Sequence, residues 1–193
     1  LPGGILVFVV LITYFLVKME FKVLTAAIGE SSKVMIGAGF VLVFTIPLVR
    51  ILINSGINDS GFDSMPVAMA NFVAHSVGDI YPLFAPLVGA LGAFIAGSNT
   101  VSNMMLSQFQ FGVADALGIS TAFMVALQAV GAAAGNMIAI HNVVAASATV
   151  GLLDQEGETL RKTIIPTIYY CLFAGIIGLI GMYYLGLTDP LMK

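Results

Sequence analysis

The sequence is poor in the side chains that a water-facing surface or a cross-linked scaffold requires. Charged residues make up 9% of the 193 residues, whereas a soluble domain usually carries about 25%. Tryptophan is absent, and the single cysteine, Cys171, lies in an apolar run, so a disulfide framework or a cysteine-rich metal site is excluded. The net charge of −3 gives no reason to expect a nucleic-acid partner.

The sequence is rich instead in long apolar segments. Hydrophobic residues make up 59% of the chain, and its mean hydropathy is +1.04. This composition predicts an all-α fold, a polytopic transmembrane helical bundle. Residue 1 is Leu rather than Met, and the apolar run from Gly4 to Val17 has neither the basic flank nor the cleavage site of a signal peptide. We therefore expect the chain to be a piece of a longer protein.

Hydropathy and polar breaks divide the chain into four parts. They are scaffold-like helices at 1–64 with an interfacial amphipathic helix at 18–33, a transport-like part at 65–151 made of a hairpin (82–118) and a broken helix (120–151), a cytoplasmic loop at 152–162, and the last transmembrane helix with the C-terminal tail at 163–193. The lysines of 18–33 favour the cytoplasmic side, and Arg161 and Lys162 then fall on that side as well.

Two short apolar arms flank the polar block Gly97 to Asn103. The first arm, Pro82 to Ala96, would be about 22 Å long as a helix, whereas a crossing needs about 30 Å. The second arm, Val101 to Leu117, is also short, and a stripe of small residues on the first arm allows close helix packing. The pattern predicts a re-entrant hairpin rather than two full spans.

A second pair of polar breaks follows downstream. The segment from Ser120 to Gly151 would reach about 45 Å as one helix, which is too long for a simple crossing. Gly135-Asn136 and His141-Asn142 fall near its middle, so we expect the helix to unwind there. Polar backbone at membrane depth is tolerated where it is buried in protein or lines a watery cavity. We therefore expect the two sets of breaks to face each other and to form a solute site.

Neutral hydrogen-bond donors near broken helix ends suit a small carboxylate, which must be held and then released. The predicted substrate-binding residues are Ser98, Asn99, Thr100, Ser102, Asn103, Gln128, Asn136 and Asn142. His141 is the predicted proton carrier, because histidine changes charge nearest to neutral pH, and Asp115 is the second proton-coupling candidate. No nucleotide-binding loop or metal-ligand motif occurs, so neither a cofactor nor a metal is expected.

Simpler interpretations of these residues remain open. The polar block could be a turn that caps two helices, and Gln128 could make an interhelical hydrogen bond. Asp115 could reach water from the end of its arm. Ser98 and His141 could be imagined as the nucleophile and base of a membrane-embedded hydrolase, although no spacing signature supports that reading.

Three runs carry a family resemblance. They are GSNTVSN (97–103), QAVGAAAGNM (128–137) and IHNVVAASATVG (140–151), continued by Arg161-Lys162-Thr163 and by Pro166 with Tyr169-Tyr170. Together they resemble the C-terminal half of the bacterial L-lactate permease family. The resemblance implies proton symport of L-lactate, D-lactate and glycolate by a multi-pass protein of the bacterial cytoplasmic membrane. It also implies that an N-terminal part, absent here, is a partner of this chain.

The Ser98-Asn99-Thr100 tip is also similar to the hairpin tips of the divalent anion–sodium symporters. This second resemblance implies that the chain is one repeat of an elevator-type secondary transporter, which could form a homodimer. It makes a sodium-coupled carboxylate transporter the main alternative. A non-transporting assembly subunit fits poorly, because it would not need polar breaks inside the membrane.

Overall fold

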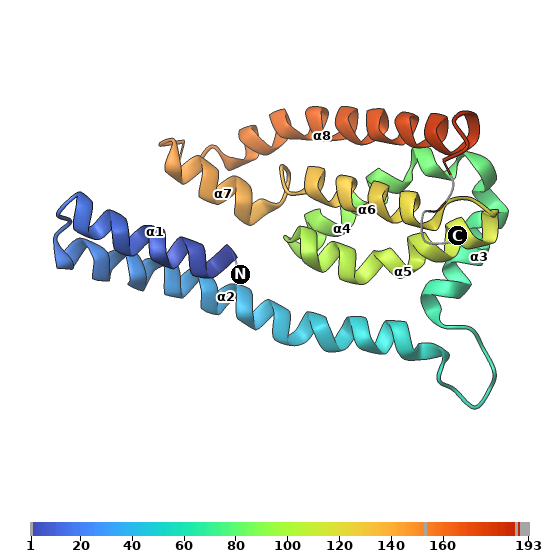
Figure 1. Ribbon diagram of the computed structural model, residues 1–193, viewed down its shortest axis with the longest axis horizontal. Helices are drawn as coiled ribbons and strands as arrows, with labels where there is room; N and C mark the ends of the chain where they lie inside the picture. Colours follow the sequence, from blue (N-terminus) through green and yellow to red (C-terminus); the bar gives the residue numbers. More distant parts are fainter. Residues whose placement is uncertain (1, 153, 188, 190–193) are drawn as a thin grey trace. The chain divides into compact units, whose positions relative to one another are not determined.

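The computed structural model describes residues 2–152, 154–187 and 189, and over these residues the chain is helical, with no strand (Figure 1). The predicted all-α class is therefore confirmed. The elements in chain order are α1 (Pro2–Leu16), α2 (Phe21–Ile53), the 3₁₀ helix η1 (Asn54–Gly56), α3 (Met65–Val77), the 3₁₀ helix η2 (Gly78–Leu83), α4 (Ala85–Ala96), α5 (Asn99–Leu117), α6 (Thr121–Gly135), α7 (Ile140–Thr149), α8 (Glu156–Leu179) and the π-helical turn η3 (Ile180–Tyr184).

The chain divides into two compact units, Leu1–Pro47 and Leu48–Lys193. The first unit consists of α1 and the part of α2 up to Pro47, joined by a tight turn in which Lys18 has a φ of +48°. Apolar side chains of α1, among them Phe8, Phe15 and Leu16, are largely exposed. Such a surface is compatible with lipid.

Helix α2 differs from the sequence prediction of an interfacial helix that ends near residue 33. The structure has one helix of 33 residues, which includes residues 21–33 of the predicted interfacial helix and the apolar segment after it. The prediction placed a boundary where polarity changes, but no helix-breaking residue stands there. The hydroxyl groups of Thr25 and Ser32 donate to carbonyl oxygens one turn earlier, at Phe21 and Ile28, which is compatible with an uninterrupted helix.

In the second unit, α4, α5 and α6 form a tightly packed group covered on one side by α8. Helices α4 and α5 run in opposite directions, and α6 follows α4 in parallel (Figure 1). Three glycines allow α4 and α6 to touch backbone to backbone, because a Cβ atom at Gly89, Gly131 or Gly135 would overlap a backbone carbonyl oxygen of the facing helix. The prediction of close packing through small residues is thus confirmed for these helices.

Helix α8 begins earlier than predicted. The sequence prediction places a cytoplasmic loop at 152–162, but α8 starts at Glu156, so Pro166 lies inside the helix and not in its first turn. The ion pair between Lys162 Nζ and Glu158 Oε1, 2.7 Å apart, spans one turn of this extension. Acidic residues in the first turn, Glu156 and Glu158, also favour a helix start there.

Among the described residues, one helix is long and apolar enough to cross a membrane, namely Glu156–Tyr184. Two bent pairs pass the same criterion together. Met65–Leu83 and Ala85–Ala96 meet at 94°, and Thr121–Gly135 and Ile140–Ser147 meet at 42°. The second pair is the predicted broken helix, and its break falls at the predicted residues, directly after Gly135.

Candidate functional site

The polar block is a tight turn between α4 and α5. Gly97 ends α4 in the left-handed conformation, with a φ of +69°, and its N–H donates to Ala93 O at 2.7 Å. Ser98 follows in an extended conformation and caps α5, its Oγ accepting from Val101 N at 3.4 Å. The amide groups of the first turn of α5 therefore point toward the tip, as helix geometry requires.

The break between α6 and α7 is a short turn of tightened backbone. Consecutive N–H groups at Asn136, Met137 and Ile138 donate three residues back instead of four, at 3.0–3.3 Å. Asn142 Nδ2 reaches back from α7 to donate to Asn136 O at 3.2 Å. Asn142 is thus one of the groups that hold the break in shape.

The tip and the break lie against each other. A Cβ atom built on Gly97 would overlap the imidazole ring of His141, which places that ring directly over the Gly97 α-carbon. Figure 1 shows the α4–α5 turn beside the connection between α6 and α7. The parallel course of α4 and α6 explains the arrangement. Gly135, the last residue of α6, faces Ala90, and α4 continues six residues further to Ala96, so that Gly97 meets His141, six residues after Gly135.

Asparagine side chains occupy this junction. Asn103 Nδ2 donates to Asn99 Oδ1 at 2.9 Å on the first turns of α5. Two buried amide oxygens, Asn103 Oδ1 and Asn136 Oδ1, find no hydrogen-bond partner among the described residues. A buried acceptor without a partner is uncommon, and it marks a place where a water, an ion or a ligand can bind.

Behind the tip, a chain of buried hydrogen bonds crosses the bundle. Tyr81 Oη donates to Gln110 Oε1 at 2.8 Å, and Gln110 Nε2 donates to Gln128 Oε1 at 3.0 Å. Gln128 Nε2 then donates to Ser102 Oγ at 3.2 Å, and Ser102 Oγ donates to Gly89 O at 2.8 Å. Gln110, Gln128 and Ser102 have no exposed surface.

The structure thus separates the predicted substrate-binding residues into two groups. One group lies at the tip and the break, and it consists of Ser98, Asn99, Thr100, Asn103, Asn136 and Asn142. The other group, Ser102 and Gln128, is completely buried inside the bundle, with its polar atoms bonded within the protein. The interhelical hydrogen bond considered for Gln128 is present.

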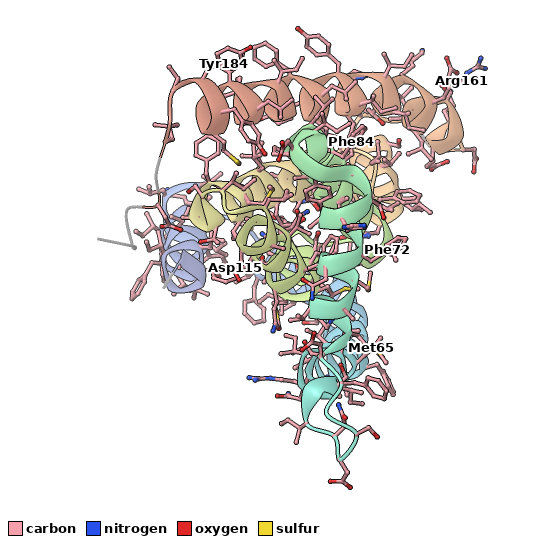
Figure 2. The ribbon with its side chains drawn as sticks, turned by 90° about the vertical axis from the view of Figure 1, so that its right-hand side faces the viewer. Met65, Phe72, Phe84, Asp115, Arg161 and Tyr184 are labelled. Atoms are coloured by element: carbon pink, nitrogen blue, oxygen red, sulfur yellow. The ribbon has the colours of Figure 1, made fainter. Side chains whose placement is uncertain are left out.

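The two proton-coupling candidates are far apart along the bundle. His141 lies at the junction, on an exposed position of α7. Asp115 lies near the other end of α5, sixteen residues after Asn99, or about 24 Å of helix. Figure 2 shows Asp115 at that end, away from Arg161 at the start of α8. No cluster of metal-ligating side chains occurs among the residues that the structure describes.

Sequence reasoning missed Gln110 and Tyr81. Gln110 lies between Phe109 and Phe111 in an arm interpreted as apolar, and the rule that a polar side chain inside a membrane protein needs a partner could have identified it. A cleft between α6 and α8 was also unexpected. Its lining, which includes Phe123, Val130 and Phe173, is almost wholly apolar and does not suit a carboxylate.

Known proteins similar in sequence to this chain include lactate and glycolate permeases. A Haemophilus influenzae protein named as an L-lactate permease is 42% identical over 125 residues, which cover 65% of this chain and 23% of that protein. The L-lactate permease of Escherichia coli K12 is 30% identical over 131 residues, 68% of this chain and 24% of the relative. Glycolate permease GlcA of the same organism is 30% identical over 124 residues, 64% of this chain and 22% of the relative.

The chain therefore spans about a quarter of the length of the curated relatives that it matches. No solved structure matches it. The family model for L-lactate permease matches residues 1–185, nearly the whole chain. The apolar helices and the broken helix fit a membrane protein, and the chain belongs to the L-lactate permease family.

Proposed function

We propose that this chain forms part of the solute pathway of a secondary transporter for L-lactate, D-lactate and glycolate. The contact between the Gly97 tip and His141 at the break carries the proposal, because it brings the two sets of neutral polar groups to one place. The names of the relatives support a small 2-hydroxy carboxylate as the solute, since they include lactate and glycolate permeases. The transporter lies in the bacterial cytoplasmic membrane and crosses it several times.

The solute carboxylate binds at the start of α5. Free N–H groups and the positive end of the helix dipole favour an anion there. Asn99 accepts from Asn103 through its oxygen, which leaves Asn99 Nδ2 to donate to a solute oxygen. Thr100 is exposed on the same turn and adds a hydroxyl donor. These donors carry no fixed charge, so the anion can leave again.

The solute hydroxyl group finds its acceptors at the unpartnered amide oxygens of Asn103 and Asn136. A 2-hydroxy acid carries one donor next to its carboxylate, and an acceptor that is otherwise unsatisfied favours that donor strongly. Ser102 and Gln128 contribute to binding through the hydrogen-bond chain behind the tip.

A proton accompanies the anion. A monocarboxylate entering a negative-inside cell needs a compensating cation, because one charge moved across 100 mV is worth about 2.3 kcal/mol. His141 is the proposed carrier, since it lies at the junction, and Asp115 is the second candidate. Sodium is the alternative coupling ion, which the two unpartnered amide oxygens could help to bind.

The chain works together with further protein. The relatives are nearly three times as long as this chain, so we propose that an N-terminal part supplies the rest of the pathway and a second hairpin tip. We also propose that α4 to α7 form the moving part of an elevator-type repeat and that the transporter is a homodimer.

The proposal is tested by uptake of labelled lactate into vesicles that contain the full-length permease. Asn99→Ala removes an amide donor from the tip, and the apparent affinity for lactate should fall by about 5- to 150-fold, equivalent to about 1–3 kcal/mol for a buried donor. Gln108→Ala, on the same helix, is the matched control and should transport normally. Lactate kinetics that are unchanged in Asn99→Ala at normal abundance would contradict the site.

A further inference from the structure

The buried hydrogen-bond chain connects four elements at one level of the second unit. It starts at Tyr81 in η2, passes through Gln110 in α5 and Gln128 in α6, and ends with Ser102 donating to the Gly89 carbonyl of α4. A branch runs from Gln110 Nε2 to Ala85 O at 3.2 Å. Each side chain in this chain is nearly or fully buried, Tyr81 being 3% exposed.

The hydrogen bonds run in one direction. Two backbone carbonyl oxygens, which can only accept, fix this direction. Ser102 Oγ must donate to Gly89 O, so the Gln128 nitrogen must face Ser102. The Gln110 nitrogen must face Ala85 O and the Gln128 oxygen, which leaves the Gln110 oxygen to accept from Tyr81. No water competes in an apolar interior, and a member left without its partner would be costly. Loss of one of these hydrogen bonds should therefore change the position of the next side chain in the series.

The last side chain of this series lies one turn from the tip. Ser102 N donates to Ser98 O at 3.0 Å, so Ser102 belongs to the first turns of α5. Its hydroxyl group ties that segment to α4 through Gly89 O and to α6 through Gln128. Gly92 leaves room for this contact, because a Cβ atom there would press on Ser102 Oγ.

We infer that Tyr81 and Gln110 are positioning residues for the solute site: through Gln128 and Ser102 they fix the first turn of α5 against α4 and α6. The inference rests on the proposed function, because it assumes that the tip binds a transported solute. Whether Tyr81 and Gln110 hold the tip in place can be tested without measuring transport. Neither residue touches the tip, and neither binds the solute. Their substitution should therefore change how the tip is held.

The labelling test uses the full-length permease with Cys171→Ser and Thr100→Cys, which places a reactive thiol on the exposed side of the tip, whereas the KM for lactate is measured with Thr100 in place. Gln110→Met keeps the side-chain size but removes three hydrogen bonds, and Tyr81→Phe removes one. In Gln110→Met the KM for lactate should rise about threefold to tenfold and the rate of thiol labelling by a hydrophilic reagent should change by a similar factor. Tyr81→Phe should do the same to a smaller extent.

Two further variants separate positioning from simple stability. Adding Tyr81→Phe to Gln110→Met should have no additional effect, since both remove the same link. Gln110→Glu in its neutral form can accept from Tyr81 and donate to Gln128, so at mildly acidic pH it should restore the parent KM and labelling rate measured at that pH. Gln108→Met is the control, because Gln108 makes no hydrogen bond with the described part of the chain and should behave like the parent.

A lower abundance with unchanged KM and labelling rate would overturn the inference, as would additive effects in the double variant. If Gln110→Met does not reach the membrane, Tyr81→Phe decides alone, since it keeps the edge-to-face contact with Phe109, whose ring centroid is 6.2 Å away. If the full-length permease with Thr100 in place fails to take up lactate, the proposed function is wrong, and the labelling rates still decide whether the network positions the tip.

Discussion

At the tip of the hairpin, the α-carbon of Gly97 faces the imidazole of His141, and the φ of Gly97 is +69°. A side chain at residue 97 would meet two separate obstacles. The left-handed conformation costs a non-glycine residue about 1–2 kcal/mol, and the Cβ atom would displace the histidine ring. These two effects can be measured separately.

Gly97→Ala should lower the thermal stability of the purified protein and reduce lactate uptake, because the His141 ring must move. Gly118→Ala is the matched control: Gly118 also has a left-handed conformation, with a φ of +67°, but has open space around its α-carbon. Gly118→Ala should therefore lose only the stability that the left-handed backbone conformation costs a residue with a side chain. Adding His141→Ala to Gly97→Ala should recover part of the lost stability, and no recovery would mean that the ring contact is unimportant.

His141→Gln tests the proposed coupling role. Glutamine can hydrogen bond but cannot carry a proton near neutral pH. The variant should therefore lose accumulation of lactate driven by a pH gradient, while exchange of internal for external lactate continues, since exchange needs no net proton movement. Accumulation at the parent level would assign His141 a structural role and leave Asp115 to be tested by Asp115→Asn.

The sequence predicted individual site residues where polarity interrupts an apolar run. Asn136 and His141 were predicted in this way, and the structure places the ring of His141 against Gly97 at the tip. Gln110 was not found, because one amide among apolar neighbours does not show that it has a partner 18 residues away on another helix. Its role depends on which helices pack together, and that information lies outside any local window.

At the scale of helices, the contact between α4 and α6 depends on glycine. A Cβ atom at Gly131 would overlap the Pro86 carbonyl, and one at Gly135 would overlap the backbone of Ala90. The facing atoms are backbone, so they cannot move aside as a flexible side chain would. The packing therefore tolerates no added methyl group at these positions.

Gly131→Ala should force α4 and α6 apart and lower the unfolding temperature by several degrees. The free energy of unfolding should fall by about 1–3 kcal/mol, as is usual for an overpacked site. Gly157→Ala on α8 is the control, because nothing lies within 4 Å of a Cβ atom there. Unfolding of the detergent-solubilised protein, followed by near-ultraviolet absorbance, measures both. Equal unfolding temperatures for the two variants would show that α4 and α6 are less tightly packed than described.

Sequence reasoning located helix breaks better than helix starts. The break after Gly135 was predicted from length and polarity, and it is present. The boundary near residue 33 was placed at a change of polarity, and α2 runs through it, since a helix stops only where capping or backbone geometry stops it. The start of α8 at Glu156 was missed for the same reason: charged residues were taken as a loop.

For the second unit as a whole, the depth of the tip bears on the membrane topology. His141 contacts Gly97, and α7 continues for eight more residues to Thr149, about 12 Å of helix, before the following turn. Helix α4, with 12 residues, is about 18 Å long, well short of a crossing of about 30 Å. The short α4 supports the proposal that the hairpin enters and leaves on the same side, whereas α5, with 19 residues, is about 28 Å long and close to the length of a crossing.

Cysteine labelling in the full-length permease tests this topology. With Cys171→Ser in place, Thr100→Cys should react with a small membrane-impermeant reagent added from outside the cell, and lactate should slow the reaction. Ser102→Cys is the matched position two residues on, and it should react slowly, because Ser102 is completely buried. Asp154→Cys, in the turn before α8, should be reached only from the cytoplasm. If Thr100→Cys also reacts only from the cytoplasm, as readily as Asp154→Cys, then α4 and α5 are full spans and the re-entrant arrangement is wrong.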